Sequence, residues 1–502
     1  MDPAPRPPNP SQLIARVFAV LLAVGAVIYA VFLVRHSASF ASGSDASGYF
    51  NSARLLSEGR FWADPRLPAG HGHTEFGLMA FQPLGFIMDL NAPRMAPTYP
   101  TGLPLHLLIG SWLGGWNHAS TLVNLVAAFA SGALVWLLGR RLELSIYWTA
   151  LGVALLWLCP LFLFSALQPM SDVLALVWSL AALYAVLRSR DGWRWSLGAG
   201  FALSMAVLVR PSNALLVLPV AVALGIEVRR YLWLALGGVP GGAFFGYYNW
   251  HVYGSPWKTG YGDVSTAFSR DFVAHNLAHF AHWIPALLTF FVCAALVAPF
   301  LRAGRNRDLA VLGLWAAILT GFYAFYYHSG ETWWYLRFIL PAFPVFVLAA
   351  LVVLQCAGDR VLTARWSWIL VVVVAAIALT SQVRLTRQLS ATAVMPGEGY
   401  YMQTAAWARE HLPPNAVLYS MQVSGSLYFY SDFMVVRWDQ IIAGRIPNLF
   451  TVFAEEHRPV YAVLYEFETK DAFKRLGGTW KKIGTVGESV FWKMESTSPP
   501  AP

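Results

Sequence analysis

Long apolar runs separated by short polar loops fill most of the chain. A helix needs about 20 mostly apolar residues to cross a lipid bilayer, and about eleven stretches have this length and composition. They are roughly 13–34, 119–138, 147–165, 171–187, 196–209, 212–226, 231–248, 284–300, 309–327, 338–355 and 366–383. The pattern predicts an all-α polytopic membrane domain over 13–383. Its first run is too long for the apolar region of a signal peptide and is expected to be a retained anchor.

A further apolar run, 103–113, is short and begins beside Pro100 and Pro104, so it is either a twelfth span or a helix on the membrane surface. Short cytoplasmic loops carry an excess of Arg and Lys. If this run does not cross and the N-terminus is cytoplasmic, nearly every arginine-rich loop lies on the cytoplasmic side. These arginines are Arg140, Arg141, Arg188, Arg190, Arg194, Arg229, Arg230, Arg302, Arg305, Arg307, Arg360 and Arg365. If it crossed, they would all move outside while Arg16 stayed inside. The predicted topology is therefore eleven spans with a surface helix.

This topology places the large connecting pieces outside the cytoplasm. They are the first loop at 35–118, a loop near 249–283, a short one at 328–337 and a tail from about 384. In the tail, strands are expected at 416–420, 434–438 and 460–465, and helices at 398–411, 448–457 and 470–476. The alternation predicts a small extracytoplasmic α/β domain over 384–502. The Pro-rich residues 1–12 are expected to form a disordered cytoplasmic tail.

Composition agrees with a membrane protein. Of 502 residues, 57% are hydrophobic and 12% charged, whereas soluble domains carry about 25% charged residues. The net charge of +9 does not indicate nucleic-acid binding, because the arginines lie in short clusters between apolar runs. The three cysteines fall in or beside apolar runs and form neither a disulfide framework nor a zinc pattern. The composition suits a bacterial cytoplasmic membrane.

Polar side chains gather at the outer ends of the predicted helices. A reactive site is expected there, because an ionisable group at the bilayer centre costs about 2.5–3.5 kcal/mol. After Ser44 and Asp45, apolar residues recur at helical spacing as far as Gly59, which predicts an amphipathic helix on the membrane surface. There are two interpretations of Asp45. Either it or Ser44 caps this helix, which stabilises the helix by about 1 kcal/mol, or Asp45 is a catalytic acid.

A second acid, Asp172, follows Ser171 and begins a helix on the same side of the membrane. It too is either a cap, worth about 0.3–1 kcal/mol, or a group facing Asp45 across one cleft. In that cleft the two acids would be general base, orienting group or metal ligands. His71, His73 and Glu75 also have a spacing that suits a metal, but they lie in a Gly/Pro-rich loop for which solvation is the simpler explanation.

Three cationic side chains near outer helix ends are candidates for an anionic headgroup. They are Arg337, Arg210 and Lys258. Arginine suits phosphate because its planar guanidinium forms two parallel charged hydrogen bonds. The alternative for each is that the long side chain only reaches up to the membrane interface.

The order of these features resembles the GT-C superfamily of membrane glycosyltransferases, which includes protein O-mannosyltransferases and bacterial aminoarabinose transferases. The resemblance covers most of the chain. It rests on Asp45, Tyr49, Ala53, Leu56 and Gly59 after the first span, Tyr99-Pro100-Thr101-Gly102-Leu103-Pro104-Leu105, Asp172, Arg210-Pro211, Gly254-Ser255-Pro256, and Arg337 before Pro341 and Pro344. One departure is Ala46, where many relatives have a second acid, and this leaves metal use and the acceptor class open.

The resemblance implies an inverting transfer of a sugar from a polyprenyl-phosphate donor to an acceptor hydroxyl, with no certain cofactor. Asp45 would deprotonate or orient the acceptor, and Asp172 would assist, with or without a divalent cation. Arg337 would stabilise the leaving phosphate, with Lys258 and Arg210 as further phosphate contacts. Tyr49, Tyr99 and Tyr335 would line the cleft for the acceptor, which is a lipid, a glycan or a protein.

Two other classes of function compete with this interpretation. A lipid or glycan flippase predicts inverted repeats and interrupted helices with polar groups at the midplane, and the sequence shows no such repeats. A non-catalytic scaffold with the same fold predicts that replacing Asp45 affects no transfer reaction.

Overall fold

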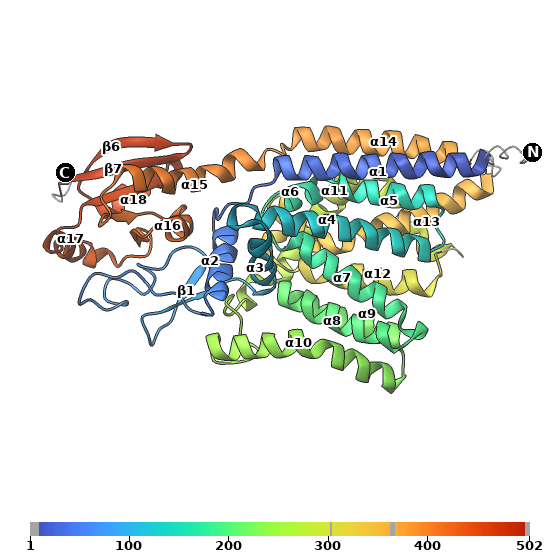
Figure 1. Cartoon of the computed structure of the whole chain (residues 1–502), viewed down its shortest axis with the longest axis horizontal. Coiled ribbons are helices and arrows are strands. Elements are labelled where there is room, and N and C mark those ends of the chain that lie inside the picture. Colours follow the sequence, from blue (N-terminus) through green and yellow to red (C-terminus); the bar gives the residue numbers. More distant parts are fainter. Residues whose placement is uncertain (1–9, 302–303, 362–366, 497–502) are drawn as a thin grey trace, which may run out of the picture.

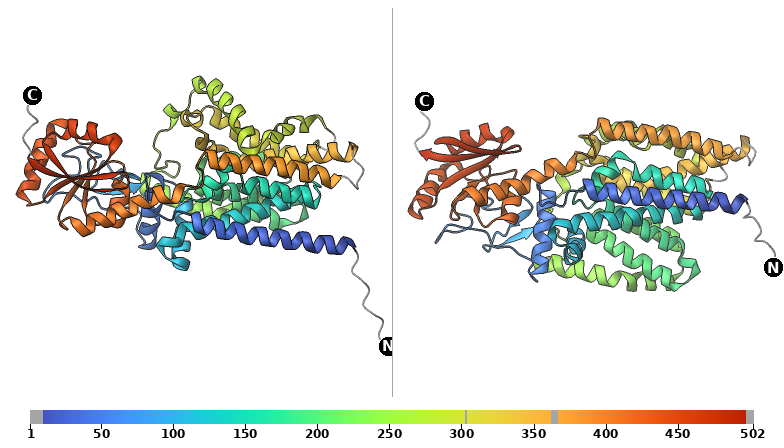
Figure 2. Two further views of the ribbon diagram at one scale, coloured as in Figure 1. Left: turned by 90° about the horizontal axis from the view of Figure 1, so that it is seen from above. Right: turned by 45° about the horizontal axis from the view of Figure 1, so that its top comes forward.

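The computed structural model describes residues 10–301, 304–361 and 367–496. Long helices run side by side in a bundle, and an α/β unit lies beyond one end of it (Figures 1 and 2). The first helix, α1 (Pro10–His36), begins at the opposite end of the bundle from this unit. The N-terminal tail expected at 1–12 lies almost wholly outside the described residues, as do Arg302 and Arg365 of the topology argument.

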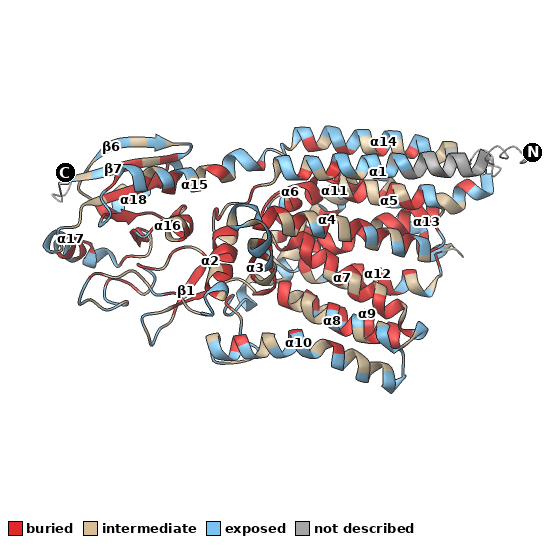
Figure 3. Cartoon of the chain, in the orientation of Figure 1, coloured by how far each residue is buried: buried red, intermediate tan, exposed pale blue. Residues whose placement is uncertain are grey.

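Each of the predicted apolar stretches overlaps a helix or a broken helix pair. After α1 these are α4 (Trp116–Arg141), α5 (Ile146–Trp157) with α6 (Pro160–Ala166), α7 (Asp172–Leu187), α8 (Trp193–Val209), η2 (Pro211–Leu216) with α9 (Val217–Leu224), α10 (Val228–Tyr253), α11 (Val273–Leu288) with η5 (Phe290–Phe300), α12 (Arg307–Ala324), η7 (Trp333–Ala342) with α13 (Phe343–Val361), and α14 (Ser367–Gln388). Buried residues concentrate in the centre of the bundle, and α10 and α14 expose apolar side chains outward (Figure 3).

Not every one of these helices is long enough to cross a membrane by itself. Within the described residues, four helices are long and apolar enough, or six if each of two bent pairs is one span. The α5–α6 pair bends by 60° where Pro160 starts the second helix. The pair made by Arg270–Leu288 and η5 bends by 109° at Thr289, whose φ of 71° breaks the helix. The protein is thus a mostly helical membrane protein, and the count of eleven spans stays a prediction.

Two shorter helices lie at the end of the bundle nearest the α/β unit: α2 (Asp45–Ser57), which runs across it, and α3 (Gly102–Gly114) (Figure 1). The expected stop of α2 at Gly59 is confirmed, with a φ of 68°. The expectation that α2 has a solvated face is wrong, because nearly every residue from Ala46 to Leu55 is buried. Its place on a membrane surface stays a prediction. The small polar side chains that suggested a solvated face, such as Ser47 and Asn51, are covered by the α/β unit.

The α/β unit contains a five-stranded sheet with the strand order β4-β3-β5-β7-β6. The central strand β5 (Val460–Tyr465) is parallel to β3 (Val417–Tyr419), which is parallel to β4 (Met434–Val436). It is antiparallel to β7 (Ser489–Ser496), which pairs with β6 (Thr479–Val486). Its helices are α15 (Val394–His411), α16 (Ser424–Tyr430), α17 (Ile446–Glu455) and α18 (Glu466–Leu476).

The three strands and three helices expected in the tail are present, whereas α16, β6 and β7 were not predicted. The strand β6 lies at the sheet edge and is mostly exposed, with Lys481 and Lys482 in its middle, so it lacks the apolar pattern of a strand. The helix α16 is too short, at 7 residues, to show helical periodicity.

The first loop packs on this α/β unit instead of standing apart from it. Its hairpin of β1 (Phe86–Met88) and β2 (Met95–Pro97) shares one hydrophobic core with the α/β unit, including Tyr419 of β3 and Phe453 of α17. Two backbone hydrogen bonds join the parts, from Arg437 N to Ala80 O and from Ile442 N to Phe76 O. Residues far apart in the sequence therefore form one body over the end of the bundle.

Candidate functional site

A cavity of about 470 Å³ lies between α2 and the starts of α7 and η7. Seven separate segments of the chain line it. The lining residues are Asp45, Tyr49, Tyr99, Met170, Ser171, Asp172, Arg210, Pro211, Ser212, Thr259, Tyr261, Val264, Phe268, Phe322, Tyr323, Tyr326, His328, Tyr335, Arg337 and Phe338. All but one of the sequence-predicted site residues meet here; the exception is Lys258.

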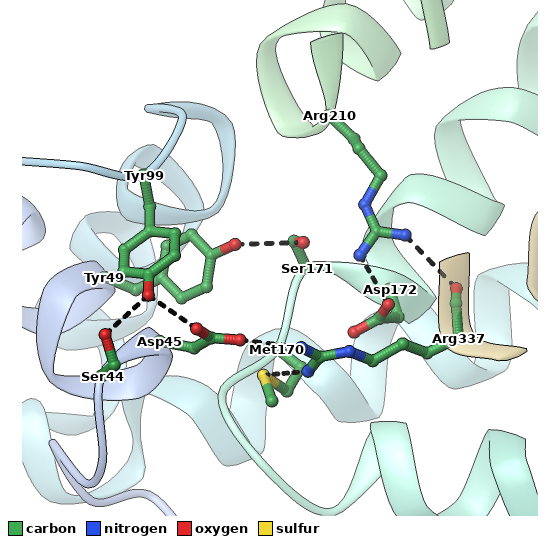
Figure 4. Close-up of polar contacts among 9 residues, drawn as sticks. All are labelled: Ser44, Asp45, Tyr49, Tyr99, Met170, Ser171, Asp172, Arg210 and Arg337. Carbon is green, nitrogen blue, oxygen red and sulfur yellow. Dashed lines mark hydrogen bonds and ion pairs between the residues drawn. The ribbon is translucent and has the colours of Figure 1, made fainter. Parts of the chain in front are cut away.

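Asp45 is the first residue of α2, and both of its carboxylate oxygens are engaged across the cavity (Figure 4). Tyr99 donates its phenol hydrogen bond to Oδ1 at 2.7 Å. Arg337 Nη2 donates to Oδ2 at 3.0 Å. Neither Asp45 nor Ser44 makes a side-chain capping bond to the described backbone of α2, and Ser44 Oγ contacts Tyr99 OH instead, at 2.8 Å. The capping alternative therefore does not describe this aspartate.

Asp172 begins α7 and is almost completely buried, with 1% of its side chain exposed. Its Oδ1 accepts from Arg210 Nη2 at 2.6 Å. Its Oδ2 is buried and has no hydrogen-bond partner among the described residues. Arg210 also donates from Nη1 to the backbone carbonyl of Arg337 at 3.3 Å. The Asp172–Arg210 pair therefore connects the end of α8 and the start of α7 to the segment that carries Arg337.

Arg337 is only partly satisfied in this arrangement. Besides Asp45 it contacts the Sδ of Met170, 3.3 Å from Nη1, and a thioether is a weak acceptor. Its buried Nε has no partner within the described parts of the chain. A guanidinium whose N–H groups are buried without strong acceptors is unfavourable. The group is therefore able to take an oxyanion from the cavity.

The three predicted cleft tyrosines all line the cavity. Tyr49 donates to Ser171 Oγ at 3.2 Å, and its ring lies 5.0 Å from that of Tyr99. Burial, followed by the nearby charge of Asp45, raises the pKa of both Tyr49 and Tyr99 above the ordinary value. Both phenols therefore remain protonated donors at neutral pH. Tyr335 stacks against His328, with ring centroids 5.3 Å apart.

Part of the cavity wall away from Asp45 is aromatic and was not predicted. Phe268 and Phe322 pack with centroids 4.9 Å apart, and Tyr323 stacks on Phe338 at 5.3 Å. This wall was not predictable from sequence, because Phe322, Tyr323 and Phe338 look like ordinary residues of apolar runs and Phe268 lies in a connecting loop. Met170 was also missed, although it lies two residues before Asp172. The site thus combines two ion pairs with an apolar surface.

Lys258 lies in a different place. It lines a neighbouring hollow of about 820 Å³ with Trp62, Arg94 and His251, and Thr259 forms part of the wall of both spaces. The structure therefore does not bring Lys258 together with Arg337 in one cavity.

Neither candidate metal site has a complete set of ligands. His71 Nδ1 lies 3.0 Å from Glu75 Oε2, and no group of three His, Cys, Asp or Glu side chains able to hold a metal occurs among residues 10–301, 304–361 and 367–496. Asp45 and Asp172 are each bound to an arginine. These residues alone do not fit a resident divalent cation.

Comparisons with known proteins give matches in structure only. No protein-family model matches the chain, and no curated protein sequence matches it. It is similar to the crystal structures of ArnT from Cupriavidus metallidurans, bound to undecaprenyl phosphate and in the apo state, with 14% identity and TM-scores of 0.58 and 0.59. These matches cover 97% and 96% of this chain and 100% and 98% of ArnT. The arabinofuranosyltransferase AftD from Mycobacteria matches at 12% identity and a TM-score of 0.52, over 94% of this chain and 40% of AftD. The chain therefore shares the fold of these two proteins, as its resemblance to the GT-C superfamily led us to expect.

Proposed function

We propose that this protein is an inverting glycosyltransferase that moves a sugar from a polyprenyl-phosphate donor to an acceptor hydroxyl. The main support is that one cavity is lined by Arg337, Arg210, Asp45 and Asp172. In addition, the Arg337 guanidinium has an incomplete set of hydrogen-bond acceptors. The likeness in fold to two transferases, one of them with undecaprenyl phosphate bound, supports the donor class. The reaction takes place on the extracytoplasmic face of a bacterial cytoplasmic membrane, with the N-terminus in the cytoplasm.

The donor phosphate binds at Arg337. Its Nε and Nη1 lack strong acceptors, and a phosphate oxygen supplies one. Arg210 adds a second positive charge behind it, held by Asp172 and by the Arg337 carbonyl. The aromatic wall at Phe268, Phe322 and Phe338 receives the apolar part of the donor lipid. As the sugar leaves, negative charge grows on the phosphate and is stabilised by the guanidinium.

Asp45 acts on the acceptor. Its Oδ2 is held by Arg337 in this structure, so a phosphate that takes over Arg337 frees that oxygen for an acceptor hydroxyl. The acceptor oxygen then forms a bond to the anomeric carbon, the bond from that carbon to the phosphate oxygen breaks, and Asp45 takes the hydroxyl proton. Polyprenyl phosphate leaves with the electron pair, and the configuration at the anomeric carbon inverts. Tyr99 fixes Oδ1 throughout.

Asp172 holds Arg210 and offers its free Oδ2 to a hydroxyl group of the donor sugar. Tyr49 and Tyr335 line the space around the sugar and acceptor. Lys258 borders the neighbouring hollow, and we assign it no contact with the phosphate.

Binding of undecaprenyl phosphate to the purified protein tests the donor assignment. We expect Arg337→Gln to weaken binding by at least tenfold, which is about 1.4 kcal/mol, because it removes the charge that faces the phosphate. Undecaprenol, which has no phosphate, should bind wild type and variant equally weakly.

Arg141→Gln is the matched control, since Arg141 also pairs with an aspartate, Asp308, at 2.6 Å but does not line the cavity. Equal binding of undecaprenyl phosphate by the Arg337 and Arg141 variants would contradict the donor site. A protein that transports the lipid without transferring sugar would bind undecaprenyl phosphate in this assay, but it would move no sugar from a polyprenyl-phosphate donor to an acceptor.

A further inference from the structure

The helix that carries Asp45 is held between two parts of the molecule. Its cavity side reaches Arg337 of the bundle through Asp45. Its other side is covered by α16, which belongs to the α/β unit and lies more than 360 residues further along the chain. The position of Asp45 relative to Arg337 thus depends on where α16 places α2.

Arg54, in the last turn of α2, makes the strongest of these contacts. Its Nη1 donates to the carbonyl of Phe429 at 2.6 Å, and its guanidinium carbon lies 3.7 Å from the centre of the Phe429 ring. Carbonyl groups in the last turn of a helix lack partners within it, so Arg54 satisfies one of them and stacks on the same residue.

The middle and start of α2 are held at Gly425. Asn51, which is 3% exposed, donates from Nδ2 to the Gly425 carbonyl at 3.2 Å. A Cβ atom on Gly425 would overlap the hydroxyl of Ser47, two residues after Asp45. Glycine is therefore needed here for α16 to lie this close to the first turn of α2.

The segment before Asp45 is tied to the same helix. Tyr430 OH accepts a hydrogen bond from the backbone N of Ala41 at 2.8 Å. Contacts from α16 alone thus fix the chain before Asp45 and the first turn, the middle and the end of α2.

We infer that α16 is a clamp that sets the position of Asp45 over the donor site, with Arg54 and Gly425 as its positioning residues. This inference rests on the proposed transfer reaction. It gives the α/β unit a role in the rate of the chemical step and not in donor binding, because Arg210 and the backbone of Arg337 are held within the bundle: Arg210 binds both the Arg337 carbonyl and Asp172.

The test compares Arg54→Ala with Arg66→Ala in the full-length protein. Arg66 lies in the first loop and makes the same kind of contacts with the same unit: its guanidinium lies 4.3 Å from the Tyr428 ring, and Nη1 donates to the Phe433 carbonyl at 2.8 Å. It does not lie on α2. A misplacement of 1 Å at a reacting group costs about a hundredfold in rate. Arg54→Ala should therefore lower kcat by about tenfold to a hundredfold, and leave KM for the donor and the Kd for undecaprenyl phosphate unchanged.

Arg66→Ala should lose a similar amount of thermal stability and keep its kcat. Arg54→Lys, which keeps the charge, should recover part of the rate, and Gly425→Ala should lower kcat as Arg54→Ala does. Equal kcat in the Arg54 and Arg66 variants, or a loss of donor binding in Arg54→Ala, would overturn the clamp.

Hydrogen exchange separates this inference from the proposed function. If wild type transfers no sugar, the proposed function fails, and the clamp is judged by the α2 amides alone. Faster exchange of residues 45–57 in Arg54→Ala than in Arg66→Ala supports the clamp, and equal exchange refutes it.

Discussion

Asp45 and Asp172 hold equivalent positions at the starts of their helices but differ in burial and in their partners. Both begin a helix, both follow a serine, and the sequence offered the same two interpretations for each. The structure separates them by burial and partner. Asp172 is 1% exposed and is bound to Arg210, whereas Asp45 is 30% exposed and accepts hydrogen bonds from Arg337 and Tyr99. The partners were not predictable, because they come from segments far away in the chain.

This difference predicts different costs for removing the two acids. Asp172→Ala leaves Arg210 buried and unpaired, which should destabilise the protein by about 3–5 kcal/mol. Asp45→Ala should cost less, because Asp45 is 30% exposed and Asp172 only 1%, although Arg337 is buried about as far as Arg210. Thermal unfolding of both variants in the same detergent measures the difference. Equal melting temperatures would show that the Asp172–Arg210 pair does not hold the end of the bundle.

At the scale of elements, the apolar runs located most helices of the bundle. They missed the greater part of α11, which lies in the loop predicted near 249–283, and they did not show the packing of α2. Its Ser and Asn side chains looked solvent-facing, because nothing in the sequence indicated that α16 covers them. Short elements such as α16 have too few residues to show a period, and β6 shows none because it is an exposed edge strand. Local pattern therefore predicts long helices well and contacts between distant segments poorly.

Gly102, at the start of α3, tests the packing of elements behind the site. A Cβ atom there would overlap the backbone N of Val209, the residue before Arg210. Gly102→Ala should therefore destabilise the protein by about 1–3 kcal/mol, as overpacked positions do, and lower transfer by displacing Arg210. Gly198→Ala on the exposed side of α8 is the control, because no atom lies within 4 Å of its Cβ position. This control should be neutral or slightly stabilising, and a loss in both variants would rule out a local clash.

At the scale of the whole molecule, the sequence separated an α-helical membrane part from a small α/β unit, and both are present. It divided the chain at about 384, whereas the first loop shares a hydrophobic core with the α/β unit. The cavity lies where this joint body meets the bundle, so its residues come from most of the chain. The motif order placed seven of the eight named site residues in that cavity. It could not place Lys258, because the fold of the loop at 254–263 has no periodic signal.

The most direct test of Asp45 as the base of a sugar transfer is transfer from radiolabelled polyprenyl-phosphate sugars to a membrane-lipid and glycan extract. Wild type is compared with Asp45→Asn, which keeps the size of the side chain and removes its charge, each with and without a chelator. Loss of a general base typically costs about 10²–10⁴-fold. We expect wild type to transfer sugar and a folded Asp45→Asn to lose transfer to that extent. The variant should bind undecaprenyl phosphate at least as tightly as wild type, because the carboxylate that competes for Arg337 is gone. The chelator arm shows whether a divalent cation assists. Transfer by Asp45→Asn at the wild-type rate, or donor binding without transfer by either protein, would contradict the account.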